Sequence, residues 1–77
     1  MLVAKKDDRY TIIRSQLISA RKKKGLRQSD LAKNLNVRQQ FISKIETAER
    51  GIDVLEFLTL AEALDLDPSD ILSQLKA

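Results

Sequence analysis

The stretch QSDLAKNLNVRQQFISKIE, which runs from Gln28 to Glu46, decides how this sequence folds. Its apolar residues recur three or four positions apart on both sides of Asn36, a spacing that predicts two short helices. Asparagine tolerates the left-handed backbone conformation of a tight turn, so Asn36 is expected to join them. We therefore expect helices over about residues 28–35 and 39–49, arranged as a helix-turn-helix.

The apolar residues of this stretch predict an interior that the two helices share. The small Ala32 allows the close approach that two helices crossing at about 90–120° require. Val37 is expected to fill the gap between the helices. The other inward-facing residues are predicted to be Leu31, Leu35, Ile42 and Ile45.

Helical spacing also precedes this stretch. A first helix is expected over residues 9–24, capped by Asp8 and ended by Gly25. Its inner face is predicted to hold Tyr10, Ile13, Leu17 and Ala20. We divide the chain into a flexible tail over residues 1–8 and a single domain over residues 9–77.

Two further helices are predicted after the stretch, which makes the expected fold all-α with five helices. Asp53 is followed three residues later by Glu56, the spacing of a capping box at a helix start. Pro68, directly after Asp67, is typical of the first helical position. The inner face of the fourth helix is predicted to hold Val54, Phe57, Leu58, Ala61 and Leu64.

The composition argues against several classes of protein. The chain has 77 residues, enough for one core, and it contains neither Cys nor His, so disulfides, the usual zinc ligands and the commonest general base are missing. Its two glycines do not form a phosphate-binding loop. No apolar run reaches the roughly 20 residues of a membrane span. We expect a cytoplasmic protein with no enzyme activity, cofactor, metal or membrane contact.

Charge is distributed unevenly along the chain. Residues 1–27 hold nine Lys or Arg and two Asp, whereas residues 51–77 hold one basic and six acidic residues. A basic first half favours a polyanionic partner, although surface solubility alone would also explain it. The run Lys22–Lys24 is also open to two interpretations, since it can complement the negative end of the first helix or face phosphates.

The second helix of the opening stretch has a polar side opposite Ile42 and Ile45. At about 100° per residue, this side holds Gln40, Ser43, Lys44 and Thr47. Gln39 lies in the first turn, where the tip of a helix would enter a groove. Glutamine can pair with both N6 and N7 of adenine in the major groove of DNA. The side is therefore a candidate DNA reader, with an ordinary solvated surface as the alternative.

The sequence resembles the phage-repressor-like (Cro/C1, XRE-type) helix-turn-helix DNA-binding family in two stretches, ARKKKGLRQSDLAKNLNVRQQFISKIE (residues 20–46) and DVLEFLTLAEALDLDPSDIL (residues 53–72). The resemblance runs from about Leu17 to Leu72, nearly the whole chain. It implies a lambda-repressor-like domain whose second and third helices form the helix-turn-helix. It also implies a homodimer that binds a palindromic operator through the major groove of double-stranded DNA.

The resemblance implies roles for individual residues. Bases would be read by Gln39, Gln40, Ser43 and Lys44, of which the last two can also contact phosphates. Gln28 and Thr47 would meet backbone phosphates, and Arg50 is expected to contribute a further phosphate contact. Arg21 and Glu46 match a pair that forms a buried salt bridge in many relatives, so we assign them to architecture.

Arg27 and Arg38 depart from the family pattern, which usually places a capping Ser or Thr at the first position of both motif helices. Losing a cap typically costs about 1 kcal/mol. Phosphates are favoured at helix N-termini, so an arginine there would add a second attraction for the same anion. We expect both arginines to bind phosphates. The alternative is that they are solvated while Asn36 or Asp30 provides local polar contacts.

At three further positions, the sequence does not decide the local structure or the role of the residue. Ala48 stands where the family has Gly, so the third helix is expected to run on toward Arg50. Ile52 replaces the Pro that commonly precedes the fourth helix. Phe41 can either pack on the second helix or touch a thymine methyl group.

We expect a sequence-specific transcriptional regulator, a repressor that acts as a homodimer. Part of the fourth helix and the apolar side of the fifth are the candidate dimer surface, with core packing as the alternative for Ile71, Leu72 and Leu75. Other expectations compatible with the sequence are an antitoxin that also binds a toxin and a restriction–modification controller protein. A protein-bridging adaptor with the same fold is the alternative of another class.

Overall fold

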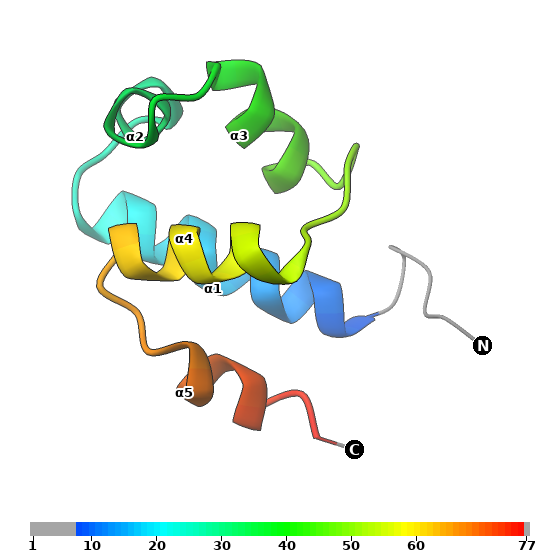
Figure 1. Cartoon of the computed structure of the whole chain (residues 1–77). Helices are drawn as coiled ribbons and strands as arrows, with labels where there is room; N and C mark the ends of the chain where they lie inside the picture. Colours follow the sequence, from blue (N-terminus) through cyan, green and yellow to red (C-terminus); the bar gives the residue numbers. More distant parts are fainter. Residues whose placement is uncertain (1–7, 77) are drawn as a thin grey trace.

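The computed structural model describes residues 8–76, which form five α-helices joined by short loops. The helices are α1 (Asp8–Lys23), α2 (Gln28–Leu35), α3 (Gln39–Glu46), α4 (Val54–Ala63) and α5 (Pro68–Ser73). The predicted all-α class and the number of helices are confirmed. Figure 1 shows α2 and α3 on one side of α1 and α4, with α5 on the other side.

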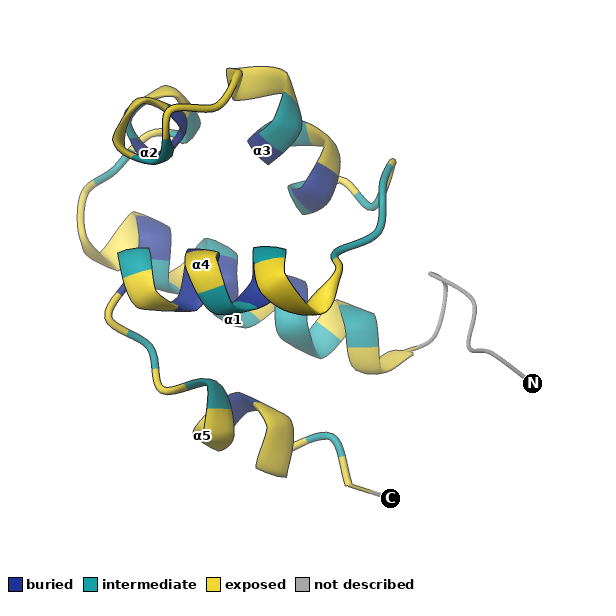
Figure 2. Ribbon diagram, in the orientation of Figure 1, coloured by how far each residue is buried: buried dark blue, intermediate teal, exposed yellow. Residues whose placement is uncertain are grey.

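The core lies where α1, α2, α3 and α4 meet. Its buried cluster consists of Leu17, Leu31, Ala32, Ile42, Ile45, Leu60 and Leu64. Burial of such aliphatic side chains stabilises the fold by roughly 1.5–3 kcal/mol each. In Figure 2 the inner sides of α2 and α3 carry the buried residues, while the loop between them and the start of α3 are exposed. The helix-turn-helix is thus fixed from inside and accessible from outside.

Most of the predicted helix ends are confirmed, because local hydrogen bonds satisfy the backbone groups there. The Asp53 carboxylate accepts from the Glu56 amide at 2.8 Å, and the Glu56 carboxylate accepts from the Asp53 amide at 3.0 Å. Asn36 takes the left-handed conformation after α2, with φ 57°. Asp67 caps α5 by accepting from the Ser69 amide at 2.8 Å.

The predicted extension of the third helix is wrong. The helix α3 ends at Glu46, and Ala48 adopts the left-handed conformation with φ 67°, although it has a side chain. The amide of Thr47 donates to the carbonyl of Ser43 at 3.0 Å, and that of Arg50 to Lys44 at 3.2 Å. These two bonds close the last turn, so the chain can reverse toward α4 despite the strain at Ala48.

The first helix begins earlier than predicted. Asp8 is the first residue of α1 rather than a cap outside it, and the helix ends at Lys23. The predicted tail therefore loses its last residue, and its remaining part falls on residues 1–7, outside the described residues.

The burial of three apolar residues bears on what the sequence predicts for them. Ile71, a candidate for the dimer surface with core packing as the alternative, is only 2 % exposed, because the fifth helix turns this side chain into the interior. Val54, expected in the core, is 73 % exposed, since it is the first residue of α4 and precedes the part of the helix that packs inward. Val37 fills the gap between the motif helices incompletely and remains 37 % exposed.

Candidate nucleic-acid interface

The outward side of α3 presents polar groups to solvent. Gln39, Gln40 and Lys44 are exposed, as is Thr47, whereas Ser43 is half-buried. A shallow surface hollow gathers part of this set and is lined by Arg38, Gln39, Gln40 and Ser43. Amide and hydroxyl groups both donate and accept hydrogen bonds, so the hollow can contact the mixed donor and acceptor edges of bases.

Arg38 stands at the N-cap of α3 with an extended backbone, φ −74° and ψ 146°. Its side chain makes no capping hydrogen bond. The first amides of a helix have no partner within the helix, and together they give that end a partial positive charge. The guanidinium of Arg38 therefore adds to an end that already favours an anion.

Arg27 at the N-cap of α2 differs from Arg38, because it has a carboxylate beside it. The Asp30 carboxylate accepts from the Arg27 backbone amide at 2.8 Å and from Nε of the same residue at 3.2 Å. The side-chain hydrogen bond with Arg27 is the main reason why the pKa of Asp30 lies below its ordinary value. The local contact expected from Asp30 as the alternative is present here.

The C-terminal end of α3 is held by a buried ion pair. Nε and Nη2 of Arg21 donate to the two carboxylate oxygens of Glu46 at 2.7 Å and 3.0 Å. Nη1 of Arg21 donates to the carbonyl of Leu26 at 2.7 Å. The ion pair joins α1 to α3, and both side chains are nine-tenths shielded from solvent.

Gln28 extends this ion pair to α2. Its Nε2 donates to Oε1 of Glu46 at 3.0 Å, an interaction that the sequence did not predict. An amide nitrogen carries two N–H groups, so Gln28 can hold Glu46 and a phosphate at the same time. The residue is half-buried at the first position of α2, which keeps its outer side near solvent.

Arg50 lies in the loop after α3, engaged from two sides. Its Nη1 donates to Oε1 of Glu56 at 2.9 Å, and its guanidinium carbon lies 4.6 Å from the centre of the Phe41 ring. The hydrogen bond from Arg50 is the main cause that lowers the pKa of Glu56. Phe41 packs against the core, the inward alternative for this residue, so Arg50 binds the loop to α3 and α4.

Sequence reasoning missed Arg14, which is buried in α1 at 7 % exposure. Its Nε donates to the carbonyl of Ile45, at the C-terminal end of α3, at 3.0 Å. A signal was available, since Arg14, Leu17 and Arg21 follow one another at helical spacing along the inner stripe of α1. A cation on an apolar stripe needs a buried acceptor, and α3 supplies one.

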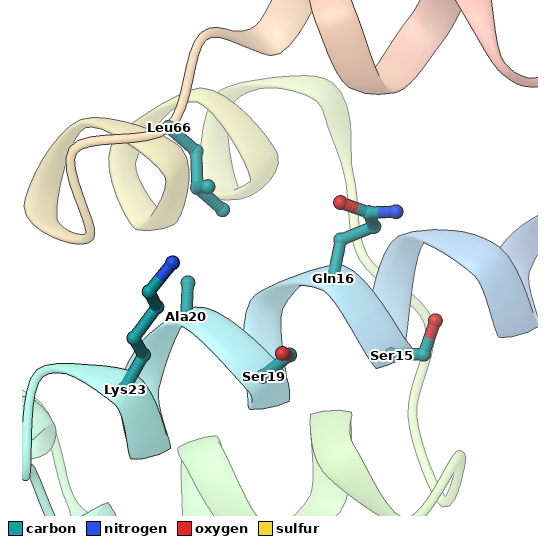
Figure 3. Close-up of a pocket in the computed structure, with 6 residues that line it drawn as sticks. All are labelled: Ser15, Gln16, Ser19, Ala20, Lys23 and Leu66. Carbon is teal, nitrogen blue, oxygen red and sulfur yellow. The ribbon is translucent and has the colours of Figure 1, made fainter.

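A second hollow lies between α1 and the segment that leads from α4 to α5. It is lined by Ser15, Gln16, Ser19, Ala20, Lys23 and Leu66 (Figure 3). Nε2 of Gln16 donates to Oε1 of Gln74 at 2.9 Å and links α1 to the end of α5. The lining residues that belong to α1 lie on another side of this helix than Arg14 and Arg21, so the hollow is separate from the polar side of α3.

The described residues, 8–76, contain neither a metal-binding cluster nor a membrane-spanning helix. Within that range, no group of three or more His, Cys, Asp or Glu side chains could hold a metal ion. In the same part of the chain, no helix has both the length and the apolar character needed to cross a membrane.

Comparisons with known proteins agree with this geometry. A family model described as helix-turn-helix matches residues 17–71. Among solved structures, the chain is similar to an XRE-family like protein from Pseudomonas syringae pv. tomato str. DC3000, with a TM-score of 0.82 and 38 % sequence identity. The similarity covers 88 % of this chain and 83 % of that chain. No curated protein matches the sequence.

Proposed function

Since the chain belongs to the phage-repressor-like (Cro/C1, XRE-type) helix-turn-helix family of DNA-binding regulators, we propose that it represses transcription from a palindromic operator as a homodimer. The observation that carries this proposal is the start of α3, where exposed amide side chains follow an arginine without a capping bond. The proposal includes neither a cofactor nor a catalytic step.

Base reading in this proposal belongs to the exposed side of α3. Gln39 and Gln40 lie at the tip of the helix and reach the base edges first, with adenine as the preferred partner. Lys44 follows one turn further along and can meet guanine or a phosphate. Ser43 is half-buried, so we assign it a short contact near the helix axis.

Phosphate contacts fix the register of α3 in the groove. Arg38 is the strongest candidate, because it is exposed and stands at the N-cap, directly before the amides that open α3. Gln28 at the start of α2 and Thr47 at the end of α3 can hold the backbone on either side of the groove. In the free protein, Arg27 forms an ion pair with Asp30, and Arg50 forms one with Glu56. Their contribution to DNA affinity is therefore smaller than that of Arg38.

The homodimer must present two α3 helices about 34 Å apart, one in each of two successive major grooves. Burial removes Ile71 from the candidate surface. Leu72, at 49 % exposure, and the half-buried Leu75 remain near the end of the chain, and Leu55 in α4 is 74 % exposed. We propose that these residues, together with Val54, supply the apolar contact between protomers.

An antitoxin or a restriction–modification controller protein would use the same DNA-binding side. The exposed apolar pair Val54 and Leu55 favours a protein contact of some kind, which a toxin could provide in place of a second protomer. An adaptor that bridges proteins through α3 is disfavoured, because the centres of protein interfaces are depleted in charge and rich in aromatic anchors.

Selection of bound duplexes from a random DNA pool tests the proposal. A repressor of this kind should enrich an inverted repeat whose half-sites lie about 10–10.5 base pairs apart, and sedimentation should show two protomers on each duplex. Leu55→Glu and Leu72→Glu separate the two parts of the dimer surface. Enrichment of no motif would reject sequence-specific regulation, while a motif without symmetry would reject the homodimer.

A further inference from the structure

Arg14 lies out of reach of DNA but touches the helix that we propose to read it. Its side chain is 7 % exposed, so it cannot meet a phosphate at the surface. Its Nε donates to the carbonyl of Ile45 at 3.0 Å, one residue before the end of α3. Any effect of Arg14 on DNA must therefore pass through the position of α3.

The last carbonyls of a helix lack partners within the helix and carry a partial negative charge. The carbonyl of Ile45 accepts from the Ala48 amide at a long 3.3 Å, and Arg14 adds a shorter, charged donor to the same oxygen. This end is therefore stabilised both by a hydrogen bond and by a cation placed where the helix dipole favours it.

Two arginines of α1 hold neighbouring residues of α3. The side chain of Arg14 donates to the main-chain carbonyl of Ile45, and the side chain of Arg21 donates to the side-chain carboxylate of Glu46. The two arginines lie seven residues apart, about two helical turns, so they project from one side of α1. Together they hold the C-terminal end of α3 against α1 at two neighbouring residues.

The hydrogen bonding of Arg14 is incomplete, in contrast to that of Arg21. Among residues 8–76, Nη2 of Arg14 is buried without a hydrogen-bond partner. Its guanidinium carbon also lies 5.7 Å from the centre of the Tyr10 ring. A buried donor without a partner reduces the free energy of unfolding, so maximal stability does not explain an arginine at this place.

We propose that Arg14 is a positioning residue for base reading, one that fixes the C-terminal end of α3 so that Gln39 and Gln40 at the other end meet the bases in register. This inference rests on the proposed function, because it assigns a role within the same DNA-binding side. Side chains that contact bases must be held to within about 0.5 Å of the productive geometry. The contact of Arg21 with Glu46 alone does not ensure this precision, so the contact of Arg14 with Ile45 is needed as well.

The decisive substitution is Arg14→Met, which keeps a long apolar stem and removes the guanidinium. The variant loses the bond to Ile45, whose carbonyl keeps the Ala48 amide, and it also loses the buried donor that has no partner, so the melting temperature should stay unchanged or rise. Affinity for the selected operator should fall about tenfold, within the range that one bidentate base contact is worth. The slope of log K against log salt should not change, since Arg14 itself meets no phosphate.

Two further variants control for charge and for length. Arg9→Met removes the same charge from an exposed position of α1 and should leave operator affinity unchanged. Arg14→Lys keeps a charged donor for the Ile45 carbonyl and should restore most of the affinity. A parallel loss of melting temperature and affinity in Arg14→Met would make Arg14 a purely structural residue and overturn the proposal, as would wild-type affinity in that variant.

Amide hydrogen exchange in the free protein separates this inference from the proposed function. In Arg14→Met, the three amides that donate to carbonyls of the last turn of α3 should exchange faster than in the wild type; they are those of Thr47, Ala48 and Arg50. The amide of Val37, which donates to Ala32 in the preceding turn, should not change. If the wild type selects no DNA sequence, the proposed function fails, and unchanged exchange at these three amides would overturn the role of Arg14 as well.

Discussion

The two ends of α3 meet opposite surroundings. At the C-terminal end, Arg14 and Arg21 reach from α1 to Ile45 and Glu46, and Gln28 joins them from α2. At the N-terminal end, the helix follows Arg38, an exposed residue whose side chain makes no capping bond. Figure 2 shows the same contrast, with buried residues toward the end of the helix and exposed ones at its start.

This difference suggests that the two ends of the eight-residue helix have different roles. The C-terminal end, which we call the braced end, gives α3 a fixed position in the free protein. The N-terminal end, the open end, keeps its amides and side chains available for a partner. Substitutions that break the buried ion pair of Arg21 and Glu46 at the braced end should therefore act mainly on stability, whereas substitutions at the open end should act mainly on DNA binding.

Glu46→Ala should have the largest effect, a loss of about 3–5 kcal/mol in the free energy of unfolding, because Arg21 would remain as a buried charge without its partner. Urea denaturation measures this loss. The double variant Arg21→Met/Glu46→Leu is the control and should recover most of the stability, since it removes both charges. A loss below about 1 kcal/mol for Glu46→Ala would mean that the braced end behaves like an exposed surface pair.

Arg38→Ser should raise the stability of the free protein and lower its affinity for DNA. A serine can cap α3, so the free energy of unfolding should rise by about 1 kcal/mol. DNA affinity should fall for all sequences alike, and the slope of log K against log salt should decrease by about 0.9 for each phosphate that the variant no longer neutralises. Arg27→Ser is the matched comparison, where the neighbouring Asp30 should make the change in affinity smaller. Unchanged affinity in Arg38→Ser would leave the arginine as an ordinary surface residue.

Ala48→Gly should stabilise the protein slightly. Alanine with φ 67° is strained, and glycine adopts this conformation without a steric cost. The greater freedom of glycine in the unfolded chain offsets part of the gain, which leaves about 0.5–1 kcal/mol by thermal denaturation. Asn36→Gly is the control at φ 57° and should gain less, because asparagine already tolerates the conformation. A destabilised Ala48→Gly would show that the loop after α3 has another conformation.

The smallest effect is expected in the loop beyond the braced end. Arg50 holds the pKa of Glu56 below its ordinary value, so the pair contributes stability at neutral pH that is lost as the pH falls through the native pKa of Glu56. Arg50→Gln should raise that pKa toward the ordinary value and flatten the acid limb of the stability profile. Partial exposure screens the pair, so the change is small, and NMR titration of Glu56 measures it directly.

The sequence was sufficient for the helices whose ends are set locally. The bounds of α2, the cap at Asp53 and the start of α5 at Pro68 follow from short-range spacing and were predicted correctly. The end of α3 was not, because Ala48 in a left-handed conformation contradicts its own preference and is enforced by the connection to α4. Tertiary context decides such a position, and residue type alone does not.

Burial and pairing across helices were harder to predict than the helices themselves. Val54 and Ile71 fit apolar spacing equally well, yet only Ile71 reaches the interior. Arg27 and Arg38 look alike in sequence, but only Arg27 has a carboxylate three residues later within reach of its side chain. The contact of Arg14 with Ile45 spans 31 residues of sequence, and local pattern carries no information about such a partner.

The central claim is that the open end of α3 reads bases, and the Gln40→Ala variant tests it most directly. Its relative affinities for the selected operator and for single-base variants of each half-site should be measured by competition at one salt concentration. We predict unchanged stability and the loss of about 1–3 kcal/mol of discrimination at one base pair in each half-site. Identical base preferences in Gln40→Ala and the wild type would contradict the account.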